Sequence, residues 1–467
     1  MVAVLPMSNL TGDASVEHVV DGFTDAIINQ LACADPRDLS VIAYTSVIAY
    51  KGERKTISEL AHDLGIEFAL ESSLRISGEQ ILISAQLIRA DLQTHIWARD
   101  YRRERRDLMG IQSEIGATIA HEISLTLAPQ QQKKQLGAKV VLNPEAYEMY
   151  LKGRYFWNQR TEEALVVGIG YFDRAIALEP THAAAHSGLS ACWVFNSVLR
   201  AQRPSEGFPR AKACATRALE LDPRSAEAHT TLGMVYVWNE FDWCNGEREF
   251  KRAIELEPGN ATSHTWFAIF LASMCRHGEA LREIGMALRI DPLSWAVRAV
   301  SAFIQEWTGN GLAAISELKK ALELNPRYGF ARMQLGFYSL TVLGNPREAV
   351  AQLRRACDDC DRHPDVLSCL GCIYAIVGSR QEALQILDEL SKTKRYVSPY
   401  FPARIHVFLG DFEKALDLLD EAFEEKFFFL TLMQKDPTLR PLAEEPRFRN
   451  LMRKMGFPSH SAGAHGG

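Results

Sequence analysis

The second half of the chain repeats one pattern of apolar and polar positions about every 34 residues. Residues 253–258, 287–292 and 321–326 each place a small residue five positions before a proline, with apolar residues between. The proline cannot continue a helix and moves the preceding residue out of the α region, so each pass predicts a helix that ends there. Such a period is typical of stacked helical hairpins, none of which can bury its apolar face alone.

One register position can be followed from unit to unit along the chain. It is occupied by Ala175, Ala218, Ala253, Ala287, Ala321, Ala356, Leu390 and Ala422. All intervals but the first are close to 34 residues, which indicates about eight units between residues 143 and 437. The first interval is about 43 residues, so we expect an insertion over residues 199–209, in the turn between the two helices of the second unit.

The first 128 residues alternate between strand and helix patterns instead. Short apolar runs predict strands, alternating residues predict a hairpin, and apolar residues at helical spacing predict helices. The expected strands are 2–5, 39–44, 68–76, 81–88 and 96–101, and the expected helices lie near 19–31, 57–64 and 108–123. The predicted fold class is therefore an α/β N-terminal domain over residues 1–128 followed by an all-α superhelical solenoid.

The remaining segments are short. Residues 129–142 are polar and lack an apolar stripe, which predicts a linker. Residues 438–457 are expected to form a C-terminal capping helix, and residues 458–467 a disordered tail. The apolar run 427–430 is expected to pack on the last repeat as part of the cap.

Composition narrows the classes of function. Hydrophobic residues make up 47% and charged residues 24%, as in globular proteins. The net charge of -6 argues against direct nucleic-acid binding by this chain. The first residues lack the features of a signal peptide, and no uncharged apolar stretch reaches about 18 residues, so we expect a cytoplasmic protein with no membrane contact. The chain starts inside an expected strand, as though a segment preceded it; a membrane segment there would make the protein periplasmic.

Nine cysteines are present, four of them in two CxxC units: Cys357, Cys360, Cys369 and Cys372. Paired CxxC units can hold zinc, and a redox pair is a further alternative. Cys369 and Cys372 take positions where repeat helices carry small residues, and the eight residues between the pairs are fewer than zinc ribbons use. The register therefore favours packing residues with reduced thiols and no metal.

Asn9 and Asp13, in the loop after the first strand, are candidates for ligand binding, because such loops often bind ligands in α/β proteins. Both residue types are also common turn formers. The sequence lacks phosphate-binding glycine patterns, HExxH and GxSxG. We therefore expect no catalytic site and no cofactor, and a protein that is not an enzyme.

Residues at fixed positions of the units carry a family resemblance. They are Leu232, Gly233, Tyr236, Gly246, Phe250, Ala253 and Pro258 in the third unit, and Leu370, Gly371, Tyr374, Ala383 and Leu387 in the seventh. The pattern resembles the tetratricopeptide repeat, which implies a scaffold for protein binding. The fifth unit departs from it, with Ser301 and Gln305 where apolar residues are usual, so we expect weaker packing there.

The N-terminal part resembles a second family. Residues 2–13, 21–24, 50–52 and 85–88 are similar to the TolB-like (FlgO-like) amino-terminal domain, with Met7 and Ser72 where phenylalanine and glycine are commoner. That resemblance implies the C-terminal half of a bacterial regulator. The other half in that family is a winged-helix DNA-binding domain, a class III nucleotide cyclase or a protein kinase.

A repeat array offers a groove lined by the first helix of each unit. The register places eight neutral residues there: Thr230, Met234, Thr265, Ile269, Met333, Phe337, Ser368 and Cys372. Such a surface favours an amphipathic helix or an extended apolar peptide. The alternative is that another segment of the same chain covers the groove.

The sequence therefore predicts a non-catalytic regulatory module that binds a protein or peptide partner in bacterial signalling or transcriptional regulation. One alternative is the sensory half of a nucleotide cyclase or DNA-binding regulator. A third is an envelope assembly factor.

Overall fold

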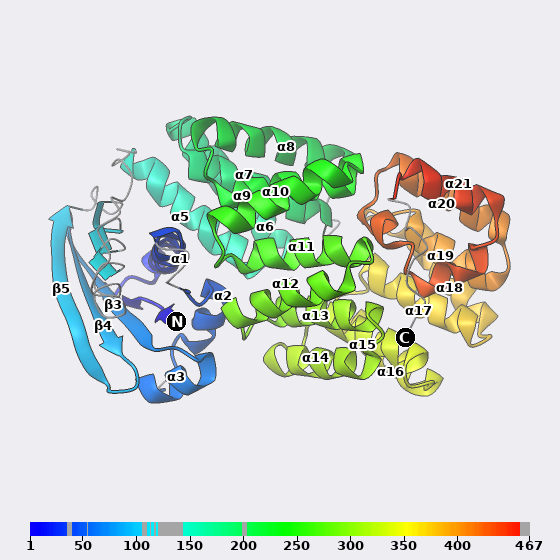
Figure 1. The fold of residues 1–467 in the computed structure, drawn as a ribbon, viewed down its shortest axis with the longest axis horizontal. Coiled ribbons are helices and arrows are strands. Elements are labelled where there is room, and N and C mark those ends of the chain that lie inside the picture. The colour runs from blue at the N-terminus through cyan, green and yellow to red at the C-terminus, as the bar shows by residue number, and fades with distance from the viewer. Residues whose placement is uncertain are drawn as a thin grey trace.

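The computed structural model describes residues 1–34, 40–53, 55–104, 110–112, 114–115, 118–119, 143–198 and 203–457. A mixed sheet lies at one end of an elongated molecule, and antiparallel helical pairs fill the rest (Figure 1). The predicted fold class, an α/β N-terminal part with an all-α superhelical solenoid, is confirmed.

The sheet of the described residues has the strand order β1-β3-β4-β5, and β2 also pairs with β3. The parallel strands are β1 (Val2–Val4) and β2 (Ser8–Asn9), which both run alongside β3 (Phe68–Ser77). β3, β4 (Gln80–Arg89) and β5 (Thr94–Glu104) form an antiparallel meander, as the alternating pattern predicts.

One face of the sheet forms the core of the N-terminal part. Leu70, Leu74 and Ile83 pack there with apolar residues of α1 (Glu17–Ala34), among them Phe23. The same core includes Tyr147 and Leu151 of the first repeat helix, so the sheet and the array share buried surface.

A strand was predicted over residues 39–44, and the described part of that range, residues 40–44, does not form one. Val41 makes a single bridge to β1, and α2 (Tyr44–Val47) begins soon afterwards. The main-chain N–H of Ala43 donates to the carbonyl oxygen of Ile290 in the array (2.9 Å), so the chain leaves the sheet for a long-range contact that local propensity does not encode.

The second predicted helix is confirmed as α3 (Ile57–Leu64). Thr56 and Glu59 form a capping box at its start, which satisfies two otherwise unpaired N–H groups. Gly65 ends it with a φ of 65°, a left-handed conformation that glycine adopts without a Cβ clash.

The described residues between 110 and 119 are helical, and Ile111, Ile115 and Ile119 are buried. The rest of the helix expected over 108–123 lies outside the described residues, as do the expected linker and tail. The domain boundaries therefore remain predictions.

Eight helical pairs correspond to the eight expected units. The first helices are α5 (Pro144–Gln159), α7 (Ala183–Val198), α9 (Ala226–Val235), α11 (Ala261–Ser273), α13 (Trp295–Trp307), α15 (Gly329–Thr341), α17 (Pro364–Ile376) and α19 (Tyr400–Leu409). The second helices are α6 (Glu162–Leu178), α8 (Pro204–Leu221), α10 (Trp243–Leu256), α12 (His277–Ile290), α14 (Gly311–Leu324), α16 (Pro346–Asp359), α18 (Arg380–Lys392) and α20 (Phe412–Glu424).

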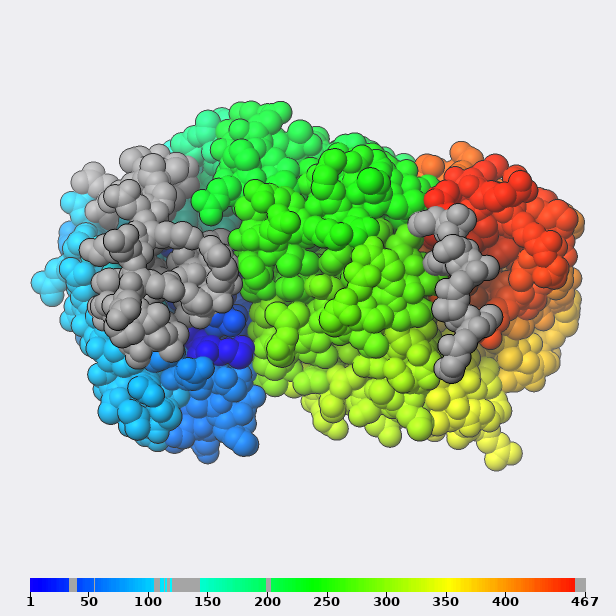
Figure 2. All heavy atoms as spheres, viewed as in Figure 1, coloured from blue at the N-terminus to red at the C-terminus, as the bar shows by residue number. Residues whose placement is uncertain are grey.

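A π-helical turn, η4 (Tyr236–Glu240), extends α9. After the last pair come two 3-10 segments, η5 (Phe428–Leu432) and η6 (Pro437–Leu442), and then α21 (Pro446–Lys454). The blue N-terminal part and the green repeat units form one continuous surface in the space-filling view (Figure 2).

Part of the expected insertion over residues 199–209 is helical, because α8 already begins at Pro204, so the extra residues of the second unit lie partly in its long helices. α7 has 16 residues and α8 has 18. α8 begins at Pro204, where the missing N–H would have no helical partner, and continues through Pro209. Residues 199–202, which connect the two helices, lie outside the described part of the chain.

The fifth unit forms a regular helical pair. Ser301 of α13 is buried at 1% exposure, next along the chain to Ala302 of a core cluster that also includes Ile315 and Leu318. The serine is therefore accommodated in the packed interior of the unit.

Candidate functional site

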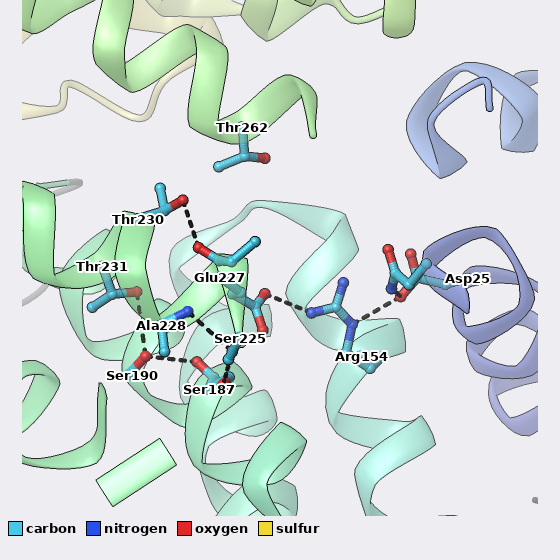
Figure 3. Close-up of polar contacts among 12 residues, drawn as sticks. Asp25, Arg154, Ser187, Ser190, Ser225, Glu227, Ala228, Thr230, Thr231 and Thr262 are labelled. Atoms are coloured by element: carbon cyan, nitrogen blue, oxygen red, sulfur yellow. Dashed lines mark hydrogen bonds and ion pairs between the residues drawn. The ribbon is translucent and has the colours of Figure 1, made fainter. Parts of the chain in front are cut away.

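A buried ion-pair network joins the N-terminal part to the array (Figure 3). Arg154 of α5 donates from Nε to Asp25 of α1 (2.8 Å) and from Nη1 to Glu227 of α9 (2.7 Å). The Arg154 side chain is 9% exposed and that of Asp25 is 4% exposed. Burial alone would lower the pKa of Arg154, but the two carboxylates raise it above its ordinary value. The guanidinium is therefore charged and connects three helices.

A second contact between the two parts lies at Asp291, the residue before the closing proline of the fourth unit. Its carboxylate accepts hydrogen bonds from the hydroxyls of Thr45 and Ser46, the second at 2.6 Å. The main-chain N–H of Leu293 donates to the same Ser46 hydroxyl oxygen (2.9 Å). Burial raises the pKa of Asp291, and the hydroxyl donors offset part of that rise. The second helix of the N-terminal part is thus held by the turn between units four and five.

Hydroxyl groups link the first helices of units two, three and four (Figure 3). The contacts are Ser187 with Ser225 (2.7 Å), Ser190 with Thr231 (3.2 Å) and Thr230 with Ser263 (2.6 Å). Each pair satisfies two buried polar groups, which would otherwise cost free energy. Thr230, a predicted groove residue, therefore faces the next unit.

A histidine or arginine at a fixed position links several units to the turn before them. His229, His264 and Arg298 each contact the carbonyl oxygen of the proline six residues earlier, at 3.3, 2.9 and 2.8 Å. Each also contacts a glutamate of its own unit, at 2.6, 2.6 and 2.8 Å. The recurrence of His or Arg six residues after each proline was the sequence signal for this contact.

A small polar cavity of about 110 Å³ lies where the two parts meet, between α1, α2, α5, α9 and the start of α11. Burial raises the pKa of Glu257 in its wall to about 7, against a hydrogen bond from Asn260 that lowers it. Burial, together with the nearby Arg154, lowers the pKa of Arg160 to about 10. The sequence did not single out these residues, because the ones that meet here are up to about 250 positions apart.

The C-terminal segment closes over the inner face of units three and four. The ring of Phe428 lies 5.2 Å from that of Trp238 and 6.5 Å from that of Trp266, both edge-to-face. Further out, Trp243 stacks on Phe457 at 5.1 Å and donates from Nε1 to the carbonyl oxygen of Met455 (3.1 Å). This part of the groove is therefore covered by the same chain, as the alternative interpretation of the sequence anticipated.

The structure separates the eight predicted groove residues into two sets. Thr230, Met234, Thr265, Ile269, Ser368 and Cys372 are at most 8% exposed. Ser368, for example, donates to the carbonyl oxygen of Phe401 (3.0 Å), so it links α17 to α19. Met333 and Phe337 of α15 are half-buried and keep part of their surface in solvent. A role in peptide binding remains a prediction for all eight, and the six buried residues are engaged within the fold.

The predicted loop residues Asn9 and Asp13 are bonded to each other. Asn9 Nδ2 donates to the carbonyl oxygen of Asp13 (3.0 Å) and to Glu17 (2.6 Å), and the Asp13 carboxylate caps the turn at Ser15 (2.8 Å). Asn9 also lines an open cleft of about 710 Å³ beside Lys51. Lys51 is already paired with Glu17 and Asp21. The loop is therefore a self-satisfied turn, and ligand binding there remains a prediction.

The four cysteines of the CxxC units are free thiols, and Cys360 is the one that is not buried. Burial raises the pKa values of Cys357 and Cys372 to about 12. Within the described residues no group of three or more His, Cys, Asp or Glu is arranged to hold a metal ion. Nor does any described helix combine the length and apolar character that a membrane span requires.

No protein-family model matches the chain. A curated protein of Rhizobium meliloti (strain 1021), named "Putative adenylate cyclase 3", is 33% identical over 190 residues. The matched region covers 40% of this chain and 32% of that protein, so the chain spans about a third of the length of its relative.

Several solved helical-repeat structures are similar to the chain at low sequence identity. The human IFIT1 dimer with m7Gppp-AAAA is 12% identical, with 68% of this chain and 78% of that chain covered and a TM-score of 0.48. YrrB, a TPR protein with an unusual peptide-binding site, is 20% identical (40% and 89% covered, TM-score 0.26). TTC0263, a thermophilic TPR protein of Thermus thermophilus, is 17% identical (42% and 99% covered, TM-score 0.35). Because all three TM-scores are below 0.5, the ligands named for these proteins are not assigned to this chain.

Proposed function

We propose that this chain is a non-catalytic regulatory module of bacterial signalling that binds an apolar segment of a protein partner on the inner face of its repeat array. The observation that carries the proposal is a set of half-buried apolar side chains on the first helices of units five and six. We call it the α13/α15 strip, and it consists of Phe303, Trp307, Met333 and Phe337.

The strip differs from the corresponding face of units three and four. There Trp238 and Trp266 are already packed against Phe428, and they are 0% and 9% exposed. The side chains of the strip leave part of their apolar area in water, and a partner that removes it gains about 25 cal/mol per Å². The Phe337 ring also lies 6.0 Å from the guanidinium of Arg404, which is buried and paired with Asp436.

Peptide display tests the proposal. Random peptides would be selected on the immobilised chain, and their affinities compared with those for Phe337→Glu. A charge placed in an apolar interface is expected to weaken binding about 10-fold or more. The matched control is Leu312→Glu, on α14, where the natural side chain is 72% exposed. Equal affinities for the wild type and Phe337→Glu would contradict the proposed surface.

The likeness to the Rhizobium protein favours a second candidate, the sensory part of a nucleotide cyclase. The test is to sequence the genome on both sides of this coding region, and to assay the complete product for cyclic AMP formation with and without residues 1–467. This candidate is supported if the complete product contains a cyclase segment and its rate of cyclic AMP formation changes when residues 1–467 are removed. A reading frame that ends at both limits of this chain, with no cyclase activity, contradicts it.

A further inference from the structure

Two residues in the wall of the 110 Å³ cavity, Arg160 and Asn158, carry hydrogen-bond donors that are not fully satisfied. Within the described part of the chain, no carboxylate lies within ion-pair distance of Arg160; its closest polar contact is a long one of 3.5 Å to the hydroxyl of Thr262. The Nδ2 group of Asn158, two residues earlier, is buried without a hydrogen-bond partner. The unpaired buried Nδ2 group of Asn158 is costly, and the half-buried Arg160 guanidinium has more N–H groups than one hydroxyl can accept from, so both groups favour an acceptor in the cavity, and an anionic one in particular.

The Arg160 guanidinium is also fixed in position. It lies 4.0 Å from the ring centre of Trp157 and 4.7 Å from that of Phe195. Its main chain ends α5 in the left-handed region, with a φ of 56°. Stacking on two aromatic faces leaves the edge of the guanidinium, where its N–H groups lie, free to meet a planar carboxylate.

The charges around the cavity restrict the ligand further. Two guanidinium groups and four carboxyl groups line it, namely Arg154, Arg160, Asp25, Glu227, Glu257 and Asp291. Arg154 neutralises Asp25 and Glu227 in part, and Asp291 accepts from two hydroxyls. Glu257 accepts a side-chain hydrogen bond from the neutral amide of Asn260 (3.0 Å). The carboxyl groups outnumber the guanidinium groups by two, or by one when Glu257 is protonated, so a ligand that carries an ammonium group beside its carboxylate fits these charges better than a simple anion.

We propose that this cavity binds a small zwitterion, an amino acid, whose carboxylate is held by Arg160 and Asn158 and whose ammonium group meets Glu257. A water molecule needs about 10–15 Å³ of such space, so the cavity accommodates a ligand of several non-hydrogen atoms. Residues of α1 and α2, including Asn29 and Tyr44, share the wall with array residues. A bound ligand therefore touches both parts of the chain.

Titration calorimetry on the whole chain tests the site. The ligands would be glycine, β-alanine, 4-aminobutanoate and L-alanine, which differ in the distance between their charges. Acetate and ethylamine each carry only one of the two groups. At least one zwitterion is expected to bind about 10-fold or more tightly than both single-charge compounds, because each charge-assisted contact is worth more than 1.4 kcal/mol.

Arg160→Gln, Asn158→Leu and Glu257→Gln are each expected to weaken that binding about 10-fold, while the exposed control Arg174→Gln leaves it unchanged. Asn158→Leu removes an unpaired group, so it keeps the test valid if Arg160→Gln does not fold. Acetate binding as tightly as the zwitterion, unaltered affinity in the variants, or no binding of any panel member up to about 10 mM each overturns the proposal. This site does not depend on the α13/α15 strip, so peptide binding there can succeed or fail separately.

Discussion

Arg154 forms ion pairs with Asp25 and Glu227 in a place where water has little access. This burial determines how much stability is lost when the Arg154 side chain is removed. A buried ion pair contributes little compared with an apolar contact of the same shape, because desolvation offsets the attraction. Removal of one partner is different, since it leaves the other charges buried and uncompensated. The same argument applies to Glu257, whose burial disfavours its charged form.

Arg154→Met is expected to lower the free energy of unfolding by about 3–5 kcal/mol, because two carboxylates lose their cation. Urea unfolding followed by circular dichroism measures the change. The control is Arg174→Met, whose exposed pair with Glu145 (3.2 Å) should be worth at most about 1 kcal/mol. Similar losses of unfolding free energy in both variants would show that the buried network does not stabilise the contact between the N-terminal part and the array.

The free energy of unfolding should fall as the pH rises, because Glu257 has a higher pKa in the folded chain than in the unfolded chain. Its pKa in the folded chain is about 7, against about 4.3 for an unfolded glutamate. Between these pH values Glu257 is protonated in the folded state and ionised in the unfolded state. Its contribution to stability is therefore full below about pH 4 and is lost as the pH rises through 7. Glu257→Gln should remove up to about 4 kcal/mol of this pH dependence. Urea midpoints at pH 5 and pH 8 that shift equally in both proteins would contradict the assignment.

At the scale of elements, the first units pack through close helix contacts around Phe172 of α6. A Cβ on Gly153 of α5 would lie 2.6 Å from that ring, and one on Gly188 of α7 would lie 2.5 Å from it. Both glycines are therefore needed for contact, although glycine costs helix stability in general. Gly170, on the same helix as Phe172, has no neighbour within 4 Å of such a Cβ.

Gly153→Ala should therefore destabilise the chain by about 1–3 kcal/mol through overpacking. Gly170→Ala is the matched control and should stabilise it by up to about 1 kcal/mol, because alanine has the higher helix propensity. Thermal unfolding of the two variants distinguishes the contact from propensity. The packing argument fails if both substitutions shift the melting temperature in the same direction.

Much of this element level could be predicted from the sequence. The register position of Ala253 and its equivalents predicted the helical pairs, because each unit buries one apolar face with the same local sequence pattern. The strand expected over 39–44 is missing because Ala43 bonds to a residue nearly 250 positions away. Residues 204–209 were assigned to a turn because of their prolines, but a proline at the first position of α8 is compatible with a helix.

At the scale of the molecule, the two ends of the chain both fold back on the middle of the array. α2 of the N-terminal part is bonded at Asp291, and the C-terminal segment packs on Trp238 and Trp243. The sequence register identified the inner face of the array, but nothing in it shows which segment covers that face. Thr230 and Met234, which the register predicted to face a ligand, line the cavity beside Arg160, but the register did not indicate the distant residues that complete it.

Trp243→Ala should loosen the closure of the C-terminal segment, since this side chain both stacks on Phe457 and donates to Met455. Small-angle X-ray scattering is expected to show a larger radius of gyration. Trp295→Ala is the control, because Trp295 packs on Tyr328 of the next unit, at 4.2 Å, and joins no distant segments. An unchanged radius for Trp243→Ala would mean that the closure does not depend on this contact.

Hydrogen exchange of the chain with and without a selected peptide tests the proposed partner surface most directly. The account predicts protection of the main-chain amides of α13 and α15, with exchange in η5 unchanged, because the partner binds on the α13/α15 strip and leaves the cap in place. Protection of α9 and α11 together with faster exchange in η5 would contradict it, since the partner would then displace Phe428 and occupy the covered part of the groove.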